Sequence, residues 1–313
     1  MKKNILIIGK SSIALRHYYI LKKINKNFFF YFLDSSKFIW VRKNKKFFKL
    51  EDNVIFDKYF LVVICTPSNL HINYINKFVR KTNYIFVEKP ITNNLHKFLN
   101  FKKKISKIKN FPKLAIGYNL RFTNSLIKFK KILNKESLGK LIYISARVGM
   151  SLDQWRGEKM KLAANKKKTG GGVILELSHE LDYLNWLFGP LSYGYSVVNK
   201  IKKFNFDVEE NFFSLIFSKN KVPINLVVDM IRANKIRTCE AVFSKGLVTI
   251  NLLNGTIKFL NKFNKKNYRY ANDINNSYKK MWSNFFNKKY YLSKTMKETH
   301  NLLDIINKIE KNN

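Results

Sequence analysis

Tyr84-Ile85-Phe86-Val87-Glu88-Lys89-Pro90 sets the architecture of this chain. Its first four residues are an apolar, β-rich run of the kind that forms a strand buried on both faces. Pro90 has no N–H to give a sheet and disfavours helical geometry at Lys89, so the strand is expected to end there. Glu88 and Lys89 then lie at the carboxyl end of a buried strand, the edge at which open α/β sheets bind ligands. A lysine there can stabilise an alkoxide or polarise a carbonyl, whereas an isolated Glu-Lys-Pro is more often a surface ion pair.

The neighbouring segments favour the functional interpretation. Apolar runs at residues 5–8, 28–33, 60–65 and 113–117 alternate with helical patterns. This alternation predicts an α/β domain over residues 1–121, built on a doubly wound parallel sheet of the Rossmann type.

The pattern changes in the second part of the chain. From residue 141 onward, strand-like runs follow one another, with Gly, Asn and Pro between them. They predict an α+β domain over residues 122–313 with an open, largely antiparallel sheet. Its last helices, about residues 275–311, are expected to pack on the first domain or beside it.

Composition excludes a disordered chain, because 46% of the 313 residues are hydrophobic and 15% are aromatic. The net charge of +40 is typical of nucleic-acid binders, but 51 of the 60 basic residues are Lys and they are scattered along the chain. Lys, Asn, Ile and Phe are all encoded by A/T-rich codons, so we interpret the charge as a solvated surface. No specific nucleic-acid partner is expected, although a polybasic nucleic-acid binder stays an alternative.

Cys65 and Cys239 are the only cysteines, and their spacing fits no metal site. Cys65 lies inside an apolar run and is expected to be a buried thiol. The N-terminus enters a strand at once, which argues against a signal peptide, and the longest apolar run, residues 28–33, is too short to span a bilayer. A reduced, cytoplasmic protein without a metal or a membrane partner is therefore expected.

A glycine turn follows the first strand, in Gly9-Lys10-Ser11-Ser12-Ile13-Ala14. A dinucleotide fingerprint needs such a turn before a helix whose N-terminus faces the pyrophosphate. Ala14 is acceptable at the third glycine position, whereas Ser11 at the second crowds the phosphate.

Asp34 ends the second strand, 25 residues after Gly9. A carboxylate near this distance binds the adenosine ribose diol and favours NAD. Ser35, Ser36 and Lys37 follow it and suit a 2′-phosphate, so NADP stays open. The alternative is that Asp34 only begins a turn.

The segment Thr66-Pro67-Ser68-Asn69-Leu70-His71 ends the strand over residues 60–65. Thr66 and Asn69 are expected to face a cofactor from the strand end. His71 is a candidate cofactor ligand, although its position slightly favours the alternative of a residue in the first turn of a helix with no chemistry.

A glycine run, Gly170–Gly172, precedes a predicted helix that ends at Gly189 and Pro190. On a single helix, Glu176, His179 and Asp182 lie within roughly 120° of one another, opposite the apolar stripe. A histidine between two carboxylates is a candidate general base, while the bland alternative is a solvated polar face.

These segments together resemble the glucose-fructose oxidoreductase / inositol 2-dehydrogenase / MocA (Gfo/Idh/MocA) family. The resemblance is carried, in order, by residues 9–17, 66–71, 88–90, 117–122 and 170–189, and it covers about the first 200 residues. It implies a Rossmann domain and an open-faced sheet domain around NAD or NADP, with reversible hydride transfer at a sugar or cyclitol hydroxyl. The exposed sheet face suggests a homodimer or homotetramer.

The resemblance also implies roles for individual residues. His179 is expected to accept the hydroxyl proton while Lys89 stabilises the oxyanion, and Glu176 or Asp182 orients His179. The family's acid usually stands four residues before the histidine, and here Glu176 stands three before it. The implied cofactor ligands are Gly9, Ser11, Ser12, Ile13, Asp34, Thr66, Pro67, Asn69, His71, Glu88, Lys89 and Asn119.

The segment Asp153-Gln154-Trp155-Arg156 resembles a subgroup found with bacterial surface-sugar pathways. It implies an acidic, amino or nucleotide-linked sugar, with Trp155 stacked on the ring and Arg121 and Arg156 on a carboxylate or phosphate. The departures at Ser11 and Glu176 leave one alternative within the same fold, a dinucleotide-binding sensor or partner protein without turnover.

Overall fold

The computed structural model describes residues 3–34, 39–43, 45–49, 58–156, 166–201 and 206–311, with only the main chain at residues 155 and 156. The chain divides into two compact units, each built from two segments. The first unit comprises Met1–Tyr118 and Tyr278–Met296, and the second comprises Asn119–Ser277 and Lys297–Asn313. The sequence prediction placed the boundary after residue 121.

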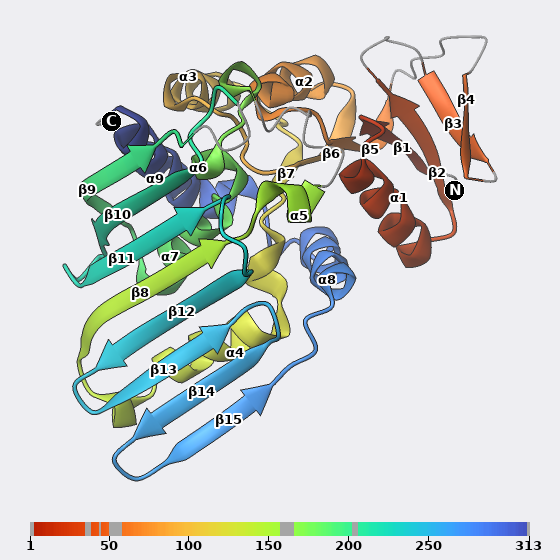
Figure 1. Cartoon of the computed structure of the whole chain (residues 1–313). Coiled ribbons are helices and arrows are strands. Elements are labelled where there is room, and N and C mark those ends of the chain that lie inside the picture. Colours follow the sequence, from red (N-terminus) through yellow and green to blue (C-terminus); the bar gives the residue numbers. More distant parts are fainter. Residues whose placement is uncertain are drawn as a thin grey trace. The chain divides into compact units, whose positions relative to one another are not determined.

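The first unit contains the predicted Rossmann-like sheet, sheet A (Figure 1). Five of its strands are parallel and adjacent in the order β2-β1-β5-β6-β7. Because parallel strands end at one edge, all five carboxyl ends lie together there. The strands are β1 (Lys3–Ile8), β2 (Phe28–Leu33), β5 (Tyr59–Ile64), β6 (Thr82–Val87) and β7 (Lys113–Ile116), and the helices between them are α1 (Ser12–Ile24), α2 (His71–Phe78) and α3 (Leu95–Ile105).

A hairpin extends sheet A beyond β2, so the predicted uninterrupted alternation of strands and helices is wrong at this point. Strands β3 (Ile39–Lys43) and β4 (Lys46–Lys49) pair antiparallel with each other, and β3 pairs antiparallel with β2. Lys45 adopts a φ of 63°, the left-handed conformation that a tight hairpin turn uses. Two aromatic residues of this hairpin, Trp40 and Phe47, lie beside Phe32 near the end of β2.

The second unit contains the predicted open and mostly antiparallel sheet, sheet B, in the order β15-β14-β13-β12-β8-β11-β10-β9. Among the described strands only the β8–β11 pair is parallel. The sequence prediction missed β15, because Lys265, Lys266 and Asn267 break the apolar alternation of a strand. The strands are β8 (Leu141–Gly149), β9 (Ser192–Asn199), β10 (Asn211–Phe217), β11 (Pro223–Asp229), β12 (Ile236–Phe243), β13 (Gly246–Asn251), β14 (Thr256–Asn261) and β15 (Lys265–Arg269).

Helices cover one face of sheet B (Figure 1). Helix α4 (Asn124–Leu133) contacts β13 and β14, and α6 (Val173–Glu176) contacts β10 and β11. On the other face, apolar side chains of β8, β9 and β10 are exposed, among them Tyr143, Tyr195, Phe213 and Leu215.

The remaining helices are α5 (Leu152–Arg156), α7 (His179–Phe188), α8 (Ile274–Phe286) and α9 (Leu292–Lys311). The predicted C-terminal segment of about 275–311 therefore forms two helices, and most of α8 belongs to the first unit whereas most of α9 belongs to the second. Within the described ranges, no helix combines the length and the apolar character needed to cross a membrane.

Candidate active site

Glu88 and Lys89 follow the last residue of β6, as the apolar run predicted, and the Lys89–Pro90 peptide is cis. Glu88 is buried, with 8% of its surface exposed. Its Oε1 lies 2.8 Å from Nε2 of His17, and its Oε2 accepts a hydrogen bond of 3.3 Å from the Lys89 main-chain N–H. The carboxylate therefore holds the main chain at Lys89. Its other partner, His17, was not predicted from the sequence.

His17 links Glu88 to helix α8. The indole N–H of Trp282 donates to Nδ1 of His17 over 3.1 Å. An indole N–H can only donate, so Nδ1 carries the lone pair and Nε2 carries the hydrogen that goes to Glu88. The rings of Phe86, Tyr278 and Trp282 surround the fully buried imidazole. A neutral histidine thus satisfies one oxygen of Glu88 and leaves the carboxylate its negative charge.

Gly117, at the end of β7, leaves room for this carboxylate. A Cβ at this position would lie 2.8 Å from Oε1 of Glu88. The charge of Glu88 also reaches neighbouring groups, because it adds to the burial that raises the pKa of the Cys65 thiol. Burial likewise raises the pKa of Tyr278, and Glu88 raises it further.

The loop after β5 carries polar atoms that suit a bound cofactor. Within the described part of the chain, Thr66 Oγ1, Ser68 Oγ and Asn69 Oδ1 are buried and have no hydrogen-bond partner. Such atoms are rare unless a ligand or water satisfies them. Thr66 and Asn69 were predicted to face the cofactor, whereas Ser68 was not singled out. Together with Pro67, they fit a polar ligand at this strand end.

His71 lies beneath this loop. Its Nε2 is 2.7 Å from the Thr66 carbonyl oxygen, and its Nδ1 is 2.8 Å from the Pro90 carbonyl oxygen. Burial lowers the pKa of the ring. Both ring nitrogens thus face main-chain oxygens, so we assign His71 to joining the loops after β5 and β6, in place of the direct cofactor contact that was expected.

The glycine turn after β1 has the geometry that a dinucleotide fingerprint needs. Gly9 has a φ of 110°, and a Cβ there would lie 2.9 Å from the Cys65 carbonyl oxygen. Ser11 is the N-cap of α1, and Ser12 and Ile13 form its first turn. Ser11 and Ser12 are exposed, so the helix N-terminus can be reached by an anion. Asp34, the predicted ribose ligand, lies at the end of β2 in an ion pair with Lys10, and Ser35, Ser36 and Lys37 lie outside the described residues.

In the second unit, the single helix predicted after the glycine run is wrong. Helix α6 ends at Glu176, and α7 begins at His179. Leu177 and Ser178 separate them, and Ser178 Oγ donates to the Leu175 carbonyl oxygen over 2.9 Å. Glu176 and His179, both half-buried, therefore lie on different helices, so the angular argument that placed them on one face does not apply.

The glycine run makes room for a carboxylate that the sequence reasoning did not find. Gly172 has a φ of 102°, and a Cβ there would lie 2.2 Å from Oε1 of the buried Glu209. Lys167 Nζ lies 3.6 Å from the other oxygen of Glu209. The last glycine of the run, Gly172, is thus explained by packing against Glu209.

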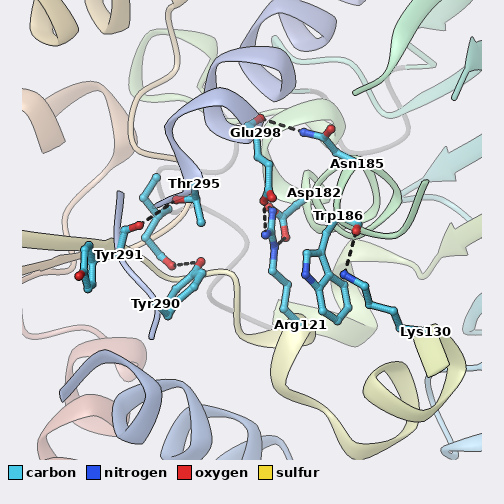
Figure 2. A network of polar contacts seen from close by, with 10 residues as sticks. Arg121, Lys130, Asp182, Asn185, Trp186, Tyr290, Tyr291, Thr295 and Glu298 are labelled. Atoms are coloured by element: carbon cyan, nitrogen blue, oxygen red, sulfur yellow. Dashed lines mark hydrogen bonds and ion pairs between the residues drawn. The ribbon is translucent and has the colours of Figure 1, made fainter. Parts of the chain in front are cut away.

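Asp182 and Arg121 form the centre of a buried network (Figure 2). Arg121 Nε and Nη2 donate to the two oxygens of Asp182 over 2.8 and 2.6 Å, and Nη1 donates to Glu298. Burial raises the pKa of Asp182, and the guanidinium opposes this. All three guanidinium nitrogens are engaged, so the structure differs from the expectations that Arg121 binds a substrate anion and that Asp182 orients His179.

Two other predicted contacts lie in the same unit. The Asn119 side-chain amide is buried and donates to Ser277 Oγ over 2.9 Å. Trp155 and Arg156 lie in α5, and their side chains are outside what the structure describes. Lys89 belongs to the first unit and His179 to the second, and their predicted convergence on one substrate stays a prediction.

Comparison with known proteins assigns the class. Residues 126–249 match a family model described as the GFO/IDH/MocA C-terminal domain, and residues 43–110 match one described as the oxidoreductase family, NAD-binding Rossmann fold. The chain belongs to the Gfo/Idh/MocA family, as the resemblance implied, and its first unit contains that family's NAD-binding Rossmann fold.

Individual relatives agree with this assignment. Inositol 2-dehydrogenase of Rhizobium meliloti is 28% identical over 131 residues, which is 41% of this chain and 36% of the relative. The matches to curated relatives such as this one span about a third to under half of their length. Among solved structures, the Actinomadura kijaniata 3-ketoreductase KijD10 with NADP and TDP-benzene is 12% identical, with a TM-score of 0.78 over 100% of this chain and 98% of that one. The Bordetella pertussis WlbA dehydrogenase with NADH and UDP-GlcNAcA is 14% identical, with a TM-score of 0.75 over 100% and 96%.

Proposed function

We propose that this protein transfers hydride reversibly between NAD(P) and a hydroxyl or keto carbon of a sugar or sugar derivative. The observation that carries the proposal is the position of Lys89. It stands at the carboxyl end of β6 in a Rossmann sheet, directly after a buried carboxylate that holds its main-chain N–H. A lysine so placed is suited to a ligand at the strand ends, where open α/β sheets bind cofactors.

The proposed chemistry divides between the two units. When bound, the cofactor supplies or accepts the hydride at its nicotinamide ring. Lys89 stabilises the oxyanion that develops on the substrate, an effect that is large in a dry site. His179 accepts the hydroxyl proton, and general-base catalysis of this kind contributes roughly 10²–10⁴-fold. Glu176 is retained as a candidate for orienting His179, and Asp182 is assigned to holding α7 through Arg121.

The substrate is proposed to be an acidic, amino or nucleotide-linked sugar of a bacterial surface-polysaccharide pathway in the cytoplasm. The resemblance of residues 153–156 to that subgroup supports this proposal. So do the sugar nucleotide bound to the WlbA dehydrogenase and the nucleotide ligand bound to KijD10. Trp155 is expected to stack on the sugar ring and Arg156 to bind its anionic group.

The test uses Lys89→Met and His179→Asn, with Lys102→Met on the exposed side of α3 as a control of equal charge change. Turnover is measured with each nicotinamide cofactor over a panel of sugars and nucleotide sugars, and NADH and NADPH binding is measured by fluorescence titration. We expect both site variants to lose at least about 100-fold in kcat, while the control keeps wild-type rates and all three variants bind cofactor.

Two results would contradict this mechanism. Full turnover by Lys89→Met with the true substrate would remove the proposed role of the amine. Tight cofactor binding by the wild type without turnover of any sugar would instead favour the alternative of a dinucleotide-binding sensor.

We also propose that the open face of sheet B joins copies of the chain into a homodimer or homotetramer. Tyr195 is 65% exposed on β9, and Phe213 and Leu215 are exposed beside it on β10. Isologous interfaces bury such self-complementary apolar surfaces. Sedimentation velocity checks this proposal, and a mass of one 37.1 kDa chain at micromolar concentration would reject it.

A further inference from the structure

An ion pair lies where β1 and β2 end. Lys10 Nζ is 2.6 Å from Oδ2 of Asp34. The Gly9 N–H donates to the Leu33 carbonyl oxygen over 2.7 Å, so the two strand ends that carry the pair are tied together. Both side chains remain partly accessible, at 27% for Lys10 and 18% for Asp34, so a ligand can reach them.

The hairpin gives Lys10 a second partner. Its Nζ lies 3.7 Å from the centre of the Trp40 ring and 5.5 Å from that of Phe47. Trp40 is opposite Phe32 in the β2–β3 register, and Phe47 packs against Phe32 with ring centres 5.0 Å apart. A cation over an aromatic face is held by the ring quadrupole. Trp40 therefore gives the ammonium a second partner besides Asp34.

The ion pair with Lys10 changes what Asp34 indicates about the choice between NAD and NADP. A carboxylate at the end of β2 accepts hydrogen bonds from the hydroxyls of the adenosine ribose. Its negative charge repels a 2′-phosphate and so disfavours NADP. Here an ammonium balances that charge, and lysine is itself a phosphate-binding side chain. The net charge of +40 adds a general attraction for an anionic ligand.

We propose that Lys10 lets the adenosine end of the cofactor site accept a 2′-phosphate, so that the protein binds NADP(H) as well as NAD(H). Lys10 is then the specificity-determining residue for the phosphate, and Asp34 is the one for the free ribose diol. This inference deepens the cofactor part of the proposed function and rests on it. The competing possibility is that Lys10 only orients Asp34 toward the diol, which makes the protein strict for NAD(H).

The experiment measures binding, so it needs no substrate. Calorimetric titration compares 5′-AMP with 2′,5′-ADP, and fluorescence titration compares NADH with NADPH. For the wild type we expect the phosphorylated member of each pair to bind within about tenfold of its partner or more tightly. Lys10→Met should lower affinity for 2′,5′-ADP and NADPH by about 10- to 100-fold, as loss of a charge-assisted contact does, with little change for 5′-AMP and NADH.

Three further variants separate local from general effects. Lys10→Arg should keep NADPH binding, because it keeps the cation. Lys23→Met, an exposed position on α1, changes the net charge equally and should leave the NADPH/NADH ratio unchanged. Asp34→Asn should weaken NADH binding more than NADPH binding. Thermal melts confirm that every variant is folded.

The outcomes distinguish this inference from the proposed function. Two results would overturn this inference and leave the proposed function standing. One is a wild type that prefers NADH over NADPH by more than about 100-fold, and the other is a Lys10→Met variant with an unchanged NADPH/NADH affinity ratio. Failure of every dinucleotide to bind overturns both proposals. A ratio that shifts as expected, in a protein that oxidises or reduces no sugar, supports this inference and rejects the proposed function.

Discussion

Glu88 in the first unit and Asp182 in the second are both buried carboxylates, and their partners differ in charge. Glu88 receives hydrogen bonds from a neutral imidazole and a main-chain N–H. Asp182 receives two from the guanidinium of Arg121. The two hydrogen-bond donors to Glu88 carry no charge, so they do not cancel its negative charge, whereas the charge of Asp182 directly faces a guanidinium.

Because of this difference, Glu88 changes the pKa of neighbouring groups, whereas Asp182 mainly joins structural elements. The charge of Glu88 contributes to the raised pKa of Cys65 and of Tyr278. Asp182 instead joins α7 to the segment carrying Arg121, and Glu298 joins α9 to the same guanidinium (Figure 2). Substitutions in the second network should thus affect stability most, and those around Glu88 should affect stability less and the Lys89 loop more.

The largest effect is expected for Arg121→Met. It leaves Asp182 buried without its cation, and breaking a buried pair in this way costs about 3–5 kcal/mol of unfolding free energy. Urea unfolding followed by circular dichroism measures the change. Arg80→Met, at an exposed position just after α2, is the matched control. A loss below about 1 kcal/mol would place the Arg121 pair among ordinary surface ion pairs.

A smaller effect is expected for His17→Leu. It leaves the fully buried Trp282 N–H without an acceptor, and one such unsatisfied buried group costs about 1–3 kcal/mol. The freed oxygen of Glu88 adds less, because this side chain keeps some exposure to water. His17→Gln, which can still donate and accept, should recover part of this. His96→Gln on the exposed side of α3 serves as control.

Nitrogen NMR of the imidazole tests the cause directly. The wild type should show hydrogen on Nε2 and a lone pair on Nδ1 of His17. Hydrogen on Nδ1 would contradict the assigned chain from Trp282 to Glu88.

The smallest effect is a pH dependence from His71, which joins the loops after β5 and β6. Burial lowers the pKa of His71 below its usual value of 6.5, so the unfolded chain takes up a proton before the folded protein does. Stability from this residue is therefore complete above the unfolded pKa and is lost as pH falls below it. The difference in melting temperature between wild type and His71→Gln should shrink from about pH 7.5 to about pH 5. A constant difference would show that the pKa of His71 is the same in the folded and the unfolded protein, and would contradict the lowered pKa.

Much of sheet A could be predicted because its strands are continuous apolar runs, and Glu88-Lys89-Pro90 marks where one of them ends. The hairpin of β3 and β4 could not, because Ile39–Lys49 is too short and too basic to be told from a loop. The break between α6 and α7 was missed because the apolar stripe continues through Leu177.

The partners of the site residues were harder to predict than the elements that carry them. Glu88 and His17 are separated by 71 residues, and His17 and Trp282 by 265. No local pattern in the sequence joins positions so far apart. The one available signal was a histidine on the apolar side of α1, which needs a partner when it is buried.

Strand β15 gives the lysine-rich composition a physical consequence. It is the last strand of sheet B, and its outer main-chain groups offer a template on which another chain could extend the sheet. Lys265, Lys266 and Arg269 stand along this border and remain exposed. Like charges on two approaching molecules repel each other there, so the same bias that enriches the surface in lysine also protects this protein from polymerising strand upon strand into filaments.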